Sequence, residues 1–387
     1  MKKKVAIITG TRAEFGLLKS VIRELLTLEE VEPFIIATGM HLSPEFGMTV
    51  QEIEGENFEI RERIEILLSS DTPIGVSKSM GLAIIGFSEA FARQKPDMTI
   101  ILGDRFEAFC AAAAATVSRV PIAHIHGGEL TFGAMDDSFR HSITKMSHIH
   151  FASTSDHRRR IIQMGEEPES VFNVGALGVE AALSIKPISQ EILESDLGFT
   201  LRRPLFVVTF HPATLDEEPA ASQVRELLAA LDQFANSTTV FTKANADMQG
   251  RQINVMLDEY VSLCPENRSA HSSLGNTRYL SLLRLADVVV GNSSSGIIEA
   301  PSLGVPTVNI GNRQGGRTHG SSVINCAVDR KEIQSAIEVA LKLGRSPSME
   351  GFPNPYCWGE TAKTIAAHIA RALRQGIPNK IFYDLKI

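Results

Sequence analysis

The chain has 387 residues, which is too long for one ordinary hydrophobic core and predicts two domains of roughly 150 to 200 residues each. Its 43% hydrophobic and 21% charged residues are typical of a globular protein, and its net charge of −7 argues against a general nucleic-acid surface, which needs fields of Lys and Arg. No stretch approaches the roughly 20 apolar residues of a membrane span, so we expect neither nucleic acid nor a membrane as a partner. Four widely spaced cysteines argue against a zinc module or a disulfide framework and favour a cytoplasmic protein.

The first half of the chain alternates short β-branched runs with longer helical patterns, which is typical of βαβ units around a parallel sheet. The predicted strands are Val5 to Ile8, Pro33 to Ala37, Met98 to Leu102, Ile122 to Ile125 and His150 to Ser153. Helices are predicted at Phe15 to Leu28 and Phe106 to Ser118. This half therefore predicts one doubly wound α/β domain.

A second series of strands follows and predicts an independent doubly wound domain. Its predicted strands are Leu205 to Phe210, Thr238 to Thr242, Val288 to Gly291 and Thr307 to Ile310. The glycine turns near residues 174–182 place the domain boundary there, which gives domains at residues 1–178 and 179–360. A helix at Thr361 to Gln375 opens the remaining segment, residues 361–387, and pattern alone assigns this helix to neither domain.

Ionisable residues gather after two apolar runs of the first half and at the start of one predicted helix. They are Asp104, Arg105, His126, Glu129, Asp136 and Arg140. Ligands bind at the carboxyl ends of strands in open α/β sheets, so these clusters favour acid–base chemistry on an anionic substrate. The plainer alternatives are a helix cap at Asp104 and an i,i+4 contact between Asp136 and Arg140, but three clusters at neighbouring strand ends favour a site.

The strands of the second half end in small polar and basic residues. Ser293 and Ser294 stand at the mouth of a predicted helix, where free N–H groups and the helix dipole would bind a phosphate. Glu299 is predicted about one turn inside that helix, where it could accept hydrogen bonds from ribose hydroxyls. The alternative is that these serines only cap the helix. The segment 311–317 adds glycines and two arginines, which favours close approach to an anion.

Seven segments, taken in order, resemble the hydrolysing UDP-N-acetylglucosamine 2-epimerases of the bacterial sialic-acid-pathway type. They are residues 9–14, 102–107, 124–129, 136–145, 210–212, 291–299 and 311–317. The resemblance implies a GT-B arrangement of two Rossmann-like α/β domains with parallel sheets and a cleft between them that binds a UDP-sugar substrate. It also implies a homodimer or homotetramer, and a final helix that packs back on the first domain. It implies no cofactor, and no metal is needed because arginines can neutralise the diphosphate.

The family reaction inverts C2 and releases the nucleotide, giving N-acetylmannosamine and UDP. Anti-elimination of UDP forms a 2-acetamidoglucal, which is then hydrated, so the site needs a base, an acid and a cationic clamp on the diphosphate. The resemblance assigns Asp104, Asp136 and Arg140 to the active site. It assigns nucleotide or substrate binding to Arg12, Arg105, His211, Asn245, His271, Ser293, Ser294, Glu299 and Arg313. Some members carry a glutamate in place of His126, so either His126 or Glu129 supplies an additional proton-transfer group.

Four other functions compete with hydrolytic epimerisation of UDP-N-acetylglucosamine for sialic-acid-type sugars. The nearest is the same reaction on UDP- or GDP-N,N'-diacetylbacillosamine, as in legionaminic acid synthesis. A non-hydrolysing epimerase would keep UDP on its product. A GT-B glycosyltransferase would share the nucleotide site but would not require the cluster of Asp104, Glu129 and Asp136. A nucleotide-sugar sensor would need no catalysis. The sequence alone does not decide between these functions.

Overall fold

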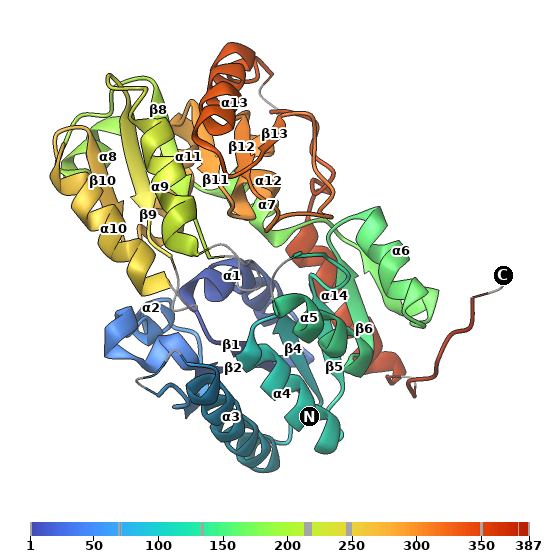
Figure 1. The fold of residues 1–387 in the computed structure, drawn as a ribbon. Coiled ribbons are helices and arrows are strands. Elements are labelled where there is room, and N and C mark those ends of the chain that lie inside the picture. The colour runs from blue at the N-terminus through green and yellow to red at the C-terminus, as the bar shows by residue number, and fades with distance from the viewer. Residues whose placement is uncertain are drawn as a thin grey trace. The chain divides into compact units, whose positions relative to one another are not determined.

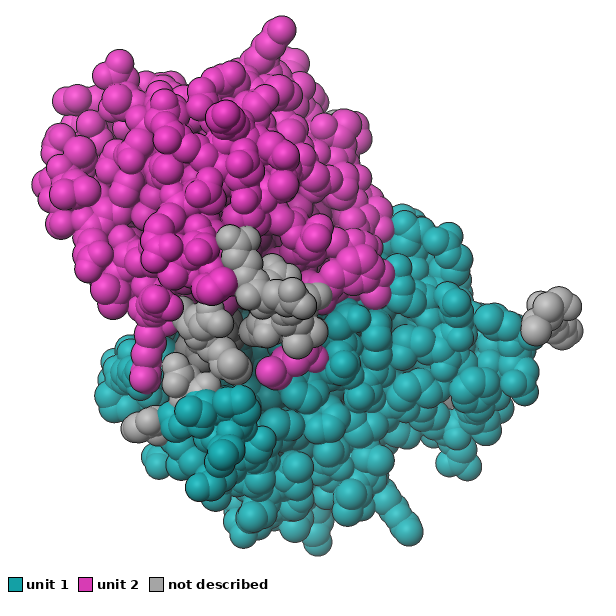
Figure 2. All heavy atoms as spheres, in the orientation of Figure 1, with its two compact units in different colours: residues 1–129, 136–180, 358–387 teal, residues 130–135, 181–357 magenta. Residues whose placement is uncertain are grey.

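The computed structural model of the chain describes residues 2–68, 70, 72–132, 135–212, 219–244, 250–348, 351–377 and 379–385. The chain divides into two compact units, shown in different colours in Figure 2. Unit 1 comprises residues 1–129, 136–180 and 358–387, and unit 2 comprises residues 130–135 and 181–357. Each unit contains one parallel sheet with helices on both faces (Figure 1).

The sheet of unit 1 has seven strands in the order β3-β2-β1-β4-β5-β6-β7. Their bounds are β1 Lys3–Thr9, β2 Val31–Thr38, β3 Ile60–Ile64, β4 Met98–Leu102, β5 Ile122–Ile125, β6 Ile149–Ala152 and β7 Val171–Asn173. All neighbours pair in parallel. The strand order reverses between β1 and β4, and the carboxyl ends of strands at such a switch point are where α/β sheets bind ligands.

The helices of the first half lie on both faces of this sheet. They are α1 Arg12–Leu26, α2 Val50–Gly55, α3 Pro73–Gln94, α4 Phe106–Val117, α5 Asp136–Met146 and α6 Ser155–Gln163, with 3₁₀ turns at Gly39–Leu42, Pro44–Phe46 and Pro168–Ser170. α7, Leu177–Ser184, carries the chain from unit 1 into unit 2. α1 begins at a capping box, in which Thr11 accepts from the Glu14 N–H and Glu14 reaches back to the Thr11 N–H.

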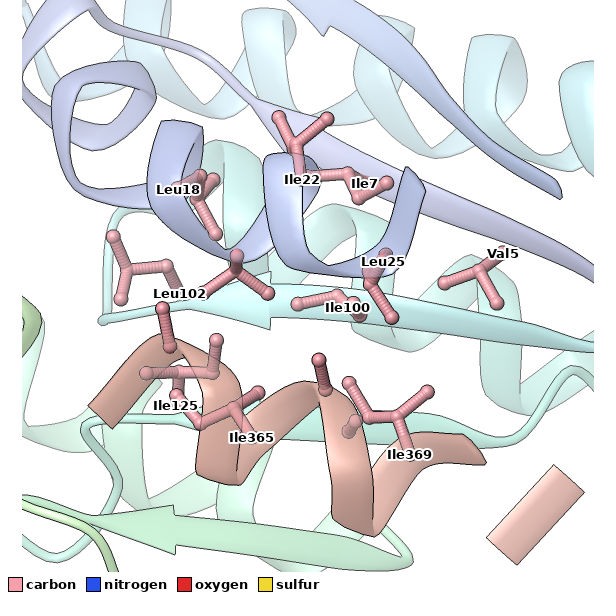
Figure 3. Close-up of a cluster of buried hydrophobic side chains, with 14 of the residues drawn as sticks. Val5, Ile7, Leu18, Ile22, Leu25, Ile100, Leu102, Ile125, Ile365 and Ile369 are labelled. Carbon is pink, nitrogen blue, oxygen red and sulfur yellow. The ribbon is translucent and has the colours of Figure 1, made fainter. Parts of the chain in front are cut away.

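The C-terminal helix α14, Thr361–Gln375, packs on unit 1 although it follows unit 2 in the sequence. Ile365 and Ile369 of this helix meet the apolar face of α1 and the strands beneath it, in a core that includes Leu18, Ile22 and Ile100 (Figure 3). Both helices have apolar residues at helical spacing, so each buries one apolar face against the same side of the sheet. The C-terminal segment thus completes the first core.

Helix α3 is the one helix in the described ranges that is long and apolar enough to cross a membrane, whereas no stretch of that kind was expected from the sequence. Its 22 residues have a mean hydropathy of 1.2 over the best window, and 33% of that window is buried. Ala83, Phe87 and Phe91 of this helix belong to the second core of unit 1, which also contains the alanine-rich face of α4. One face of α3 is therefore part of a packed protein core.

Unit 2 has a six-stranded sheet in the order β10-β9-β8-β11-β12-β13. Its strands are β8 Leu205–Thr209, β9 Thr238–Thr242, β10 Arg268–His271, β11 Val288–Gly291, β12 Thr307–Ile310 and β13 Val323–Cys326. Its helices are α8 Gln190–Leu197, α9 Ala220–Leu231, α10 Gly250–Ser262, α11 Gly275–Leu285, α12 Ser295–Ile298 and α13 Arg330–Leu343, with a 3₁₀ turn at Ala300–Leu303. The strand order reverses between β8 and β11, which places a second switch point in this sheet.

Candidate active site

Asp104 and Arg140 form the ion pair at the centre of the unit 1 cluster. Asp104 follows β4, and Arg140 lies on α5 with only 2% of its surface exposed. One nitrogen of Arg140 donates to Asp104, and Nη1 donates to Asp137 Oδ1 at 3.0 Å. Burial by itself would lower the pKa of Arg140, but the surrounding carboxylates, Asp104 first, hold it above its ordinary value. The guanidinium is therefore a fixed positive charge at the ends of the strands.

Arg140 also joins this pair to the loop after β5, because its Nη1 donates to the Glu129 carbonyl oxygen at 3.0 Å. In that loop His126 Nδ1 lies 3.7 Å from Glu129 Oε1, and both side chains are buried. His126 has a φ of 65°, a left-handed conformation that is uncommon for a residue other than glycine and is often found at functional sites. The structure thus brings together four predicted residues: Asp104, His126, Glu129 and Arg140.

The neighbouring histidine of β5 supports the backbone of the loop after β4. His124 Nε2 hydrogen-bonds to the Gly103 carbonyl oxygen at 2.8 Å, and its Nδ1 lies 3.2 Å from Thr144 Oγ1. Burial lowers the pKa of His124 to about 3, so the ring is neutral at physiological pH. A neutral ring has one N–H, and donating it to the carbonyl of Gly103 fixes the residue before Asp104.

The β1 end of the switch point carries a further acid, the partly buried Glu14, which was not among the predicted site residues. Glu14 Oε2 accepts from the backbone N–H groups of Gly10 at 2.7 Å and of Thr11 at 3.2 Å. Arg105, predicted to bind the nucleotide, donates to both carboxylate oxygens of Glu107 at 3.2 and 3.3 Å. Burial raises the pKa of Glu14 to about 7, with Arg105 opposing the shift and Glu107 adding to it. Two acids and one arginine therefore share this corner.

The remaining predicted residues of unit 1 lie at helix starts. Asp136 is the first residue of α5 and is partly buried. Its neighbour Asp137 bonds to Arg140 and lies 3.5 Å from His141 Nε2. Arg12 opens α1, and its Nη1 lies 3.6 Å from Glu52 Oε1. On the same helix, Asp137 at i,i+3 therefore bonds to Arg140 in addition to the predicted i,i+4 neighbour Asp136 on that face.

In unit 2, Asn292 ties together the loops that follow three strands. Its side-chain amide exchanges two hydrogen bonds with the His211 backbone, accepting from the N–H at 2.7 Å and donating to the carbonyl at 2.7 Å. Its own carbonyl accepts from Arg313 Nη1 at 3.0 Å and from Gln314 Nε2 at 2.8 Å. Asn292 is 2% exposed. The structure thus brings predicted residues His211 and Arg313 to one buried amide.

Gly291 explains why the chain can reach this position. Its φ is 133°, and a Cβ there would lie 1.9 Å from the Thr209 carbonyl oxygen, so no other residue fits. The close approach sets Asn292, Ser293 and Ser294 at the carboxyl end of β11 beside the end of β8. The glycine is thus a condition for the arrangement of this loop.

The helix that follows differs from the prediction. α12 has four residues and leads into a 3₁₀ turn, so it supplies little helix dipole. Its N-cap Ser294 makes no side-chain capping bond, and Ser293 Oγ accepts from the Ser295 N–H at 3.3 Å. Glu299 stands at the C-cap of α12 and not one turn inside a longer helix. Pro301 explains the difference, because a proline cannot continue an α-helical ladder.

Tyr279 of α11 is a further, partly buried polar residue at this loop. Its hydroxyl donates to Ser295 Oγ at 2.8 Å. Burial raises the pKa of Tyr279 above its ordinary value, and the nearby charge of Glu299 adds to the shift. The only signal for this residue in the sequence is that tyrosine is rare in the chain, with four in all. It therefore could not be predicted as part of the cluster.

Two predicted residues remain. His271 ends β10, and its Nε2 lies 3.0 Å from Ser269 Oγ, while its carbonyl accepts from the Lys243 N–H at 2.9 Å. Burial lowers the pKa of His271, and Lys243 and Arg278 add to the shift. Asn245 lies outside the described residues. Within the described part of the chain, no group of three or more His, Cys, Asp or Glu residues is placed to hold a metal ion.

The comparison with known families identifies the class of protein that carries these clusters. The profile of the UDP-N-acetylglucosamine 2-epimerase family matches residues 23–370. The chain belongs to this family, whose relatives include hydrolysing nucleotide-sugar 2-epimerases, and the family and the fold class predicted from the sequence are confirmed. It is an enzyme of the hydrolysing 2-epimerase type.

Three relatives span most of the chain. A GDP/UDP-N,N'-diacetylbacillosamine 2-epimerase (hydrolyzing) of Campylobacter jejuni is 42% identical over 337 residues, 87% of each chain. The polysialic acid biosynthesis protein P7 of Escherichia coli is 37% identical over 387 residues, 99% of this chain and 98% of the relative. A UDP-N-acetylglucosamine 2-epimerase of Neisseria meningitidis is 32% identical over 350 residues, 90% of each chain. These relatives differ in the substrate that their names give.

The fold agrees with solved structures of the same family. The crystal structure of a UDP-GlcNAc 2-epimerase from Neisseria meningitidis bound to UDP-GlcNAc superposes with a TM-score of 0.78 at 18% identity, covering 95% of this chain and 100% of that chain. At that identity the likeness shows the fold, which is GT-B-like with two Rossmann-like parallel sheets.

Proposed function

We propose that the enzyme converts UDP-N-acetylglucosamine and water to N-acetylmannosamine and UDP, as a step in sialic-acid-type sugar synthesis. The observation that carries the proposal is that Arg140 bonds both to Asp104 and to the loop of Glu129, which gathers several proton-transfer groups at one buried cation. Removal of the C2 proton and its return from the opposite face need more than one such group. A glycosyltransferase would not require this gathering.

Asp104 and Asp136 are the leading acid–base residues in this proposal. Removal of the C2 proton sends the C–H electrons into a C1=C2 double bond while the C1–O bond to UDP breaks. Water then adds at C1 and a proton returns to C2 on the opposite face, which gives the inverted sugar. His126 or Glu129 supplies the additional proton transfer. Arg140 keeps the charge of this carboxylate cluster balanced throughout.

We assign the nucleotide to the other predicted residues. Arg12, Arg105 and Arg313 would neutralise the diphosphate, and Glu299 would accept from the ribose hydroxyls. His211, Asn245, His271, Ser293 and Ser294 complete the assigned set. The short α12 lowers the expected contribution of a helix dipole, so the bonds that Asn292 makes to His211 and Arg313 become the main support for this assignment. No cofactor is required by the reaction.

A second candidate substrate is UDP- or GDP-N,N'-diacetylbacillosamine. The 42% identity to the Campylobacter jejuni enzyme favours it, because that value exceeds the 32% identity to the Neisseria meningitidis enzyme. Both substrates have an acetamido group at C2, so the same acid–base residues would serve. The difference lies at C4 and C6 of the sugar and not at the reacting carbons.

Purified enzyme should be incubated in deuterated water with UDP-N-acetylglucosamine and, separately, with each diacetylbacillosamine nucleotide. We expect UDP release and free N-acetylmannosamine that carries deuterium at C2. Product that still carries UDP would indicate a non-hydrolysing epimerase, and release only from a diacetylbacillosamine nucleotide would establish the second candidate. UDP release without deuterium at C2 would contradict epimerisation altogether.

We further propose a cytoplasmic homodimer or homotetramer, since nucleotide sugars are cytoplasmic metabolites in the sialic-acid-type pathway. Light scattering on the eluting protein would measure the subunit number. For the division of labour along the chain we propose residues 1–178 for proton transfer, residues 179–360 for the nucleotide and residues 361–387 as a C-terminal support of the first domain. These limits are close to the compact units, except that residues 130–135 pack with unit 2.

A further inference from the structure

We propose that His126 is the additional proton-transfer group and that Ser153 and His157 are positioning residues that hold the Glu129 carboxylate against it. The inference rests on the proposed function and deepens it, because the sequence left the choice between His126 and Glu129 open. It gives the two residues different tasks: the imidazole transfers the proton, and the carboxylate orients the imidazole and balances its charge.

The four side chains form a continuous buried chain. His126 Nδ1 lies 3.7 Å from Glu129 Oε1, and the same oxygen accepts from Ser153 Oγ at 2.8 Å. Ser153 Oγ is 2.9 Å from His157 Nδ1. Ser153 and His157 are fully buried, Glu129 is 3% exposed and His126 is 9% exposed. Exposure thus rises along the chain toward His126, which is the outermost of the four side chains, although its Nε2 atom is itself buried.

The hydrogen count fixes the direction of each bond. A serine hydroxyl has a single hydrogen, and Ser153 gives it to Glu129. The contact between Ser153 and His157 must therefore be donated by the Nδ1–H of His157. The hydroxyl is locked toward Glu129, which selects the ionised carboxylate at that oxygen. An ionised carboxylate beside Nδ1 of His126 favours a proton there, so Nε2 is the nitrogen that exchanges a proton with the sugar.

The backbone of the loop is built to hold this arrangement. Gly128 has a φ of 75°, and a Cβ at this position would lie 2.5 Å from the His157 carbonyl oxygen, so the loop presses directly on the start of α6. The His126 N–H donates to the Phe151 carbonyl at 2.9 Å, which ties the left-handed residue to β6. Thr154 caps α6 by accepting from the His157 N–H at 3.2 Å. The two histidines are therefore held by neighbouring strand ends.

Other charged groups also lie around the chain. Arg140 from α5 and Arg160 from α6 both donate to backbone carbonyls of the loop, at Glu129 and Gly128. Asp104 is engaged by Arg140. His124 of β5 is neutral, because burial lowers its pKa to about 3. The carboxylate of Glu129 lies beside the His126 ring within this set of charges.

In the reaction, Nε2 of neutral His126 uses its lone pair to bond the proton from C2. The C2–H electrons form the C1=C2 double bond, and the C1–O pair leaves with UDP. The ring becomes an imidazolium beside the Glu129 carboxylate, so the pair as a whole changes from one negative charge to neutral. Because the carboxylate stabilises the imidazolium, it should strengthen the base.

Ser153→Ala and His157→Leu test the proposal. Ser153→Ala removes the hydrogen bond to the Glu129 carboxylate, and His157→Leu removes the donor that holds the Ser153 hydroxyl. We therefore expect kcat to fall about tenfold to a hundredfold with little change in KM. His126 must be neutral to act as a base, and loss of the oriented carboxylate lowers its pKa. The acidic limb of kcat/KM should therefore move to lower pH. His157→Asn keeps an N–H donor and should restore much of the activity.

Ser147→Ala is the matched control, because Ser147 is fully buried in the same unit and its hydroxyl donates to the Ile143 carbonyl at 2.7 Å. It should leave kcat and the acidic limb unchanged. The position of the limb does not depend on how much enzyme is folded, so it remains readable in a destabilised variant. UDP affinity and the thermal midpoint, measured on every variant, separate loss of fold from loss of positioning.

A double-mutant cycle gives the sharpest outcome. In a His126→Gln background there is no imidazole to position, so adding Ser153→Ala should cost nothing more. Equal losses in the presence and absence of His126 would overturn the inference, as would an acidic limb that stays in place in Ser153→Ala and His157→Leu. Wild-type enzyme that releases UDP from none of the nucleotide sugars would instead contradict the proposed function.

Discussion

The strand ends of the two sheets carry polar clusters of opposite kinds. In unit 1 the cluster consists of charged side chains, centred on the buried Arg140 with the partly buried Asp104 and Asp137. In unit 2 the neutral residue Asn292 organises the loops. Its side-chain amide makes two hydrogen bonds to the His211 backbone, and its backbone carbonyl accepts one each from Arg313 and Gln314. Both clusters lie at a switch point of a parallel sheet. Similar folds thus provide two different ways to arrange polar groups.

The difference matches the tasks that we propose for the two clusters. Burying a charge costs several kcal/mol per ion unless partners compensate, so a cluster of ions is retained where charge changes during a reaction. A neutral amide network fixes backbone geometry without this cost, which suits a site that only has to bind. The contrast predicts that substitutions in the Arg140 cluster lower kcat and that substitutions in the Asn292 cluster raise KM.

The largest effect should come from Asp104→Asn. The amide has nearly the same shape but cannot take up a proton, and it leaves Arg140 with less negative charge around it. We expect kcat to fall by about a thousandfold or more, since general acid–base catalysis contributes about 10²- to 10⁴-fold and electrostatic stabilisation adds to it. Steady-state kinetics with UDP titrations would measure it.

Asp156→Asn is the control, because this acid on α6 pairs with Arg159 at the surface. It should change kcat less than twofold, and Asp104→Asn should leave UDP affinity nearly intact. Weaker UDP binding with an unchanged kcat would place Asp104 in the binding machinery and end the contrast between the two clusters.

The second-largest effect should come from Asn292→Ala, and it should be on UDP binding and not on kcat. The substitution removes both bonds to the His211 backbone and leaves that partly buried N–H and carbonyl without their amide partner, which costs about 1–3 kcal/mol. We expect KM and the UDP dissociation constant to rise about tenfold to a hundredfold while kcat changes little. Calorimetric titration with UDP would measure the loss.

Asn309→Ala supplies the matched comparison within unit 2. Asn309 is also a buried amide, but it donates to Asn325 Oδ1 at 2.8 Å and not to the His211 loop. It should lower stability without weakening UDP binding. If both alanine variants weaken UDP binding equally, the effect of Asn292 is a general loss of packing in the sheet.

The interior of each sheet could be predicted from the sequence, but its edges could not. The nine predicted strands are confirmed, with end shifts of at most two residues, and they are the central strands and their neighbours. The strands that were missed, β3, β7, β10 and β13, are the two edges of each sheet. Edge strands are only partly buried, so their sequences lack the continuous apolar run: β10 reads RSAH and β3 reads IRERI.

The candidate site shows the same limit at the level of single residues. Asp104 and Arg140 could be predicted because charged residues directly after a buried strand, or opening a helix, stand out. Ser153 and Asn292 could not, because Ser153 contacts Glu129, 24 residues away, and Asn292 bonds to the backbone of His211. His157 could not either, because its partner Ser153 gains a role only through that distant contact. Small polar residues at strand ends are also common in loops, so only the fold reveals which of them meet.

The smallest effect concerns stability and pH, and it tests whether buried charge extends to the β1 corner of unit 1. The pKa of Glu14 is about 7 in the folded protein against 4.5 for an ordinary glutamate. The folded state therefore holds a proton that the unfolded state releases between these pH values. The stabilisation is complete below pH 4.5 and is lost as the pH rises through 7.

Glu14→Gln lacks this titration, so the stability of the wild type relative to the variant should fall between pH 5 and pH 8 by about 1–3 kcal/mol. Calorimetric midpoints at both pH values would measure it, with Glu169→Gln as an exposed control that should follow the wild type. The glutamine can still accept from the Gly10 N–H, and any weakening of the cap should change the stability by the same amount at both pH values. Parallel curves for wild type and Glu14→Gln would mean that Glu14 is ionised in the folded protein. The buried charge of unit 1 would then include this carboxylate as a permanent ion beside Arg105.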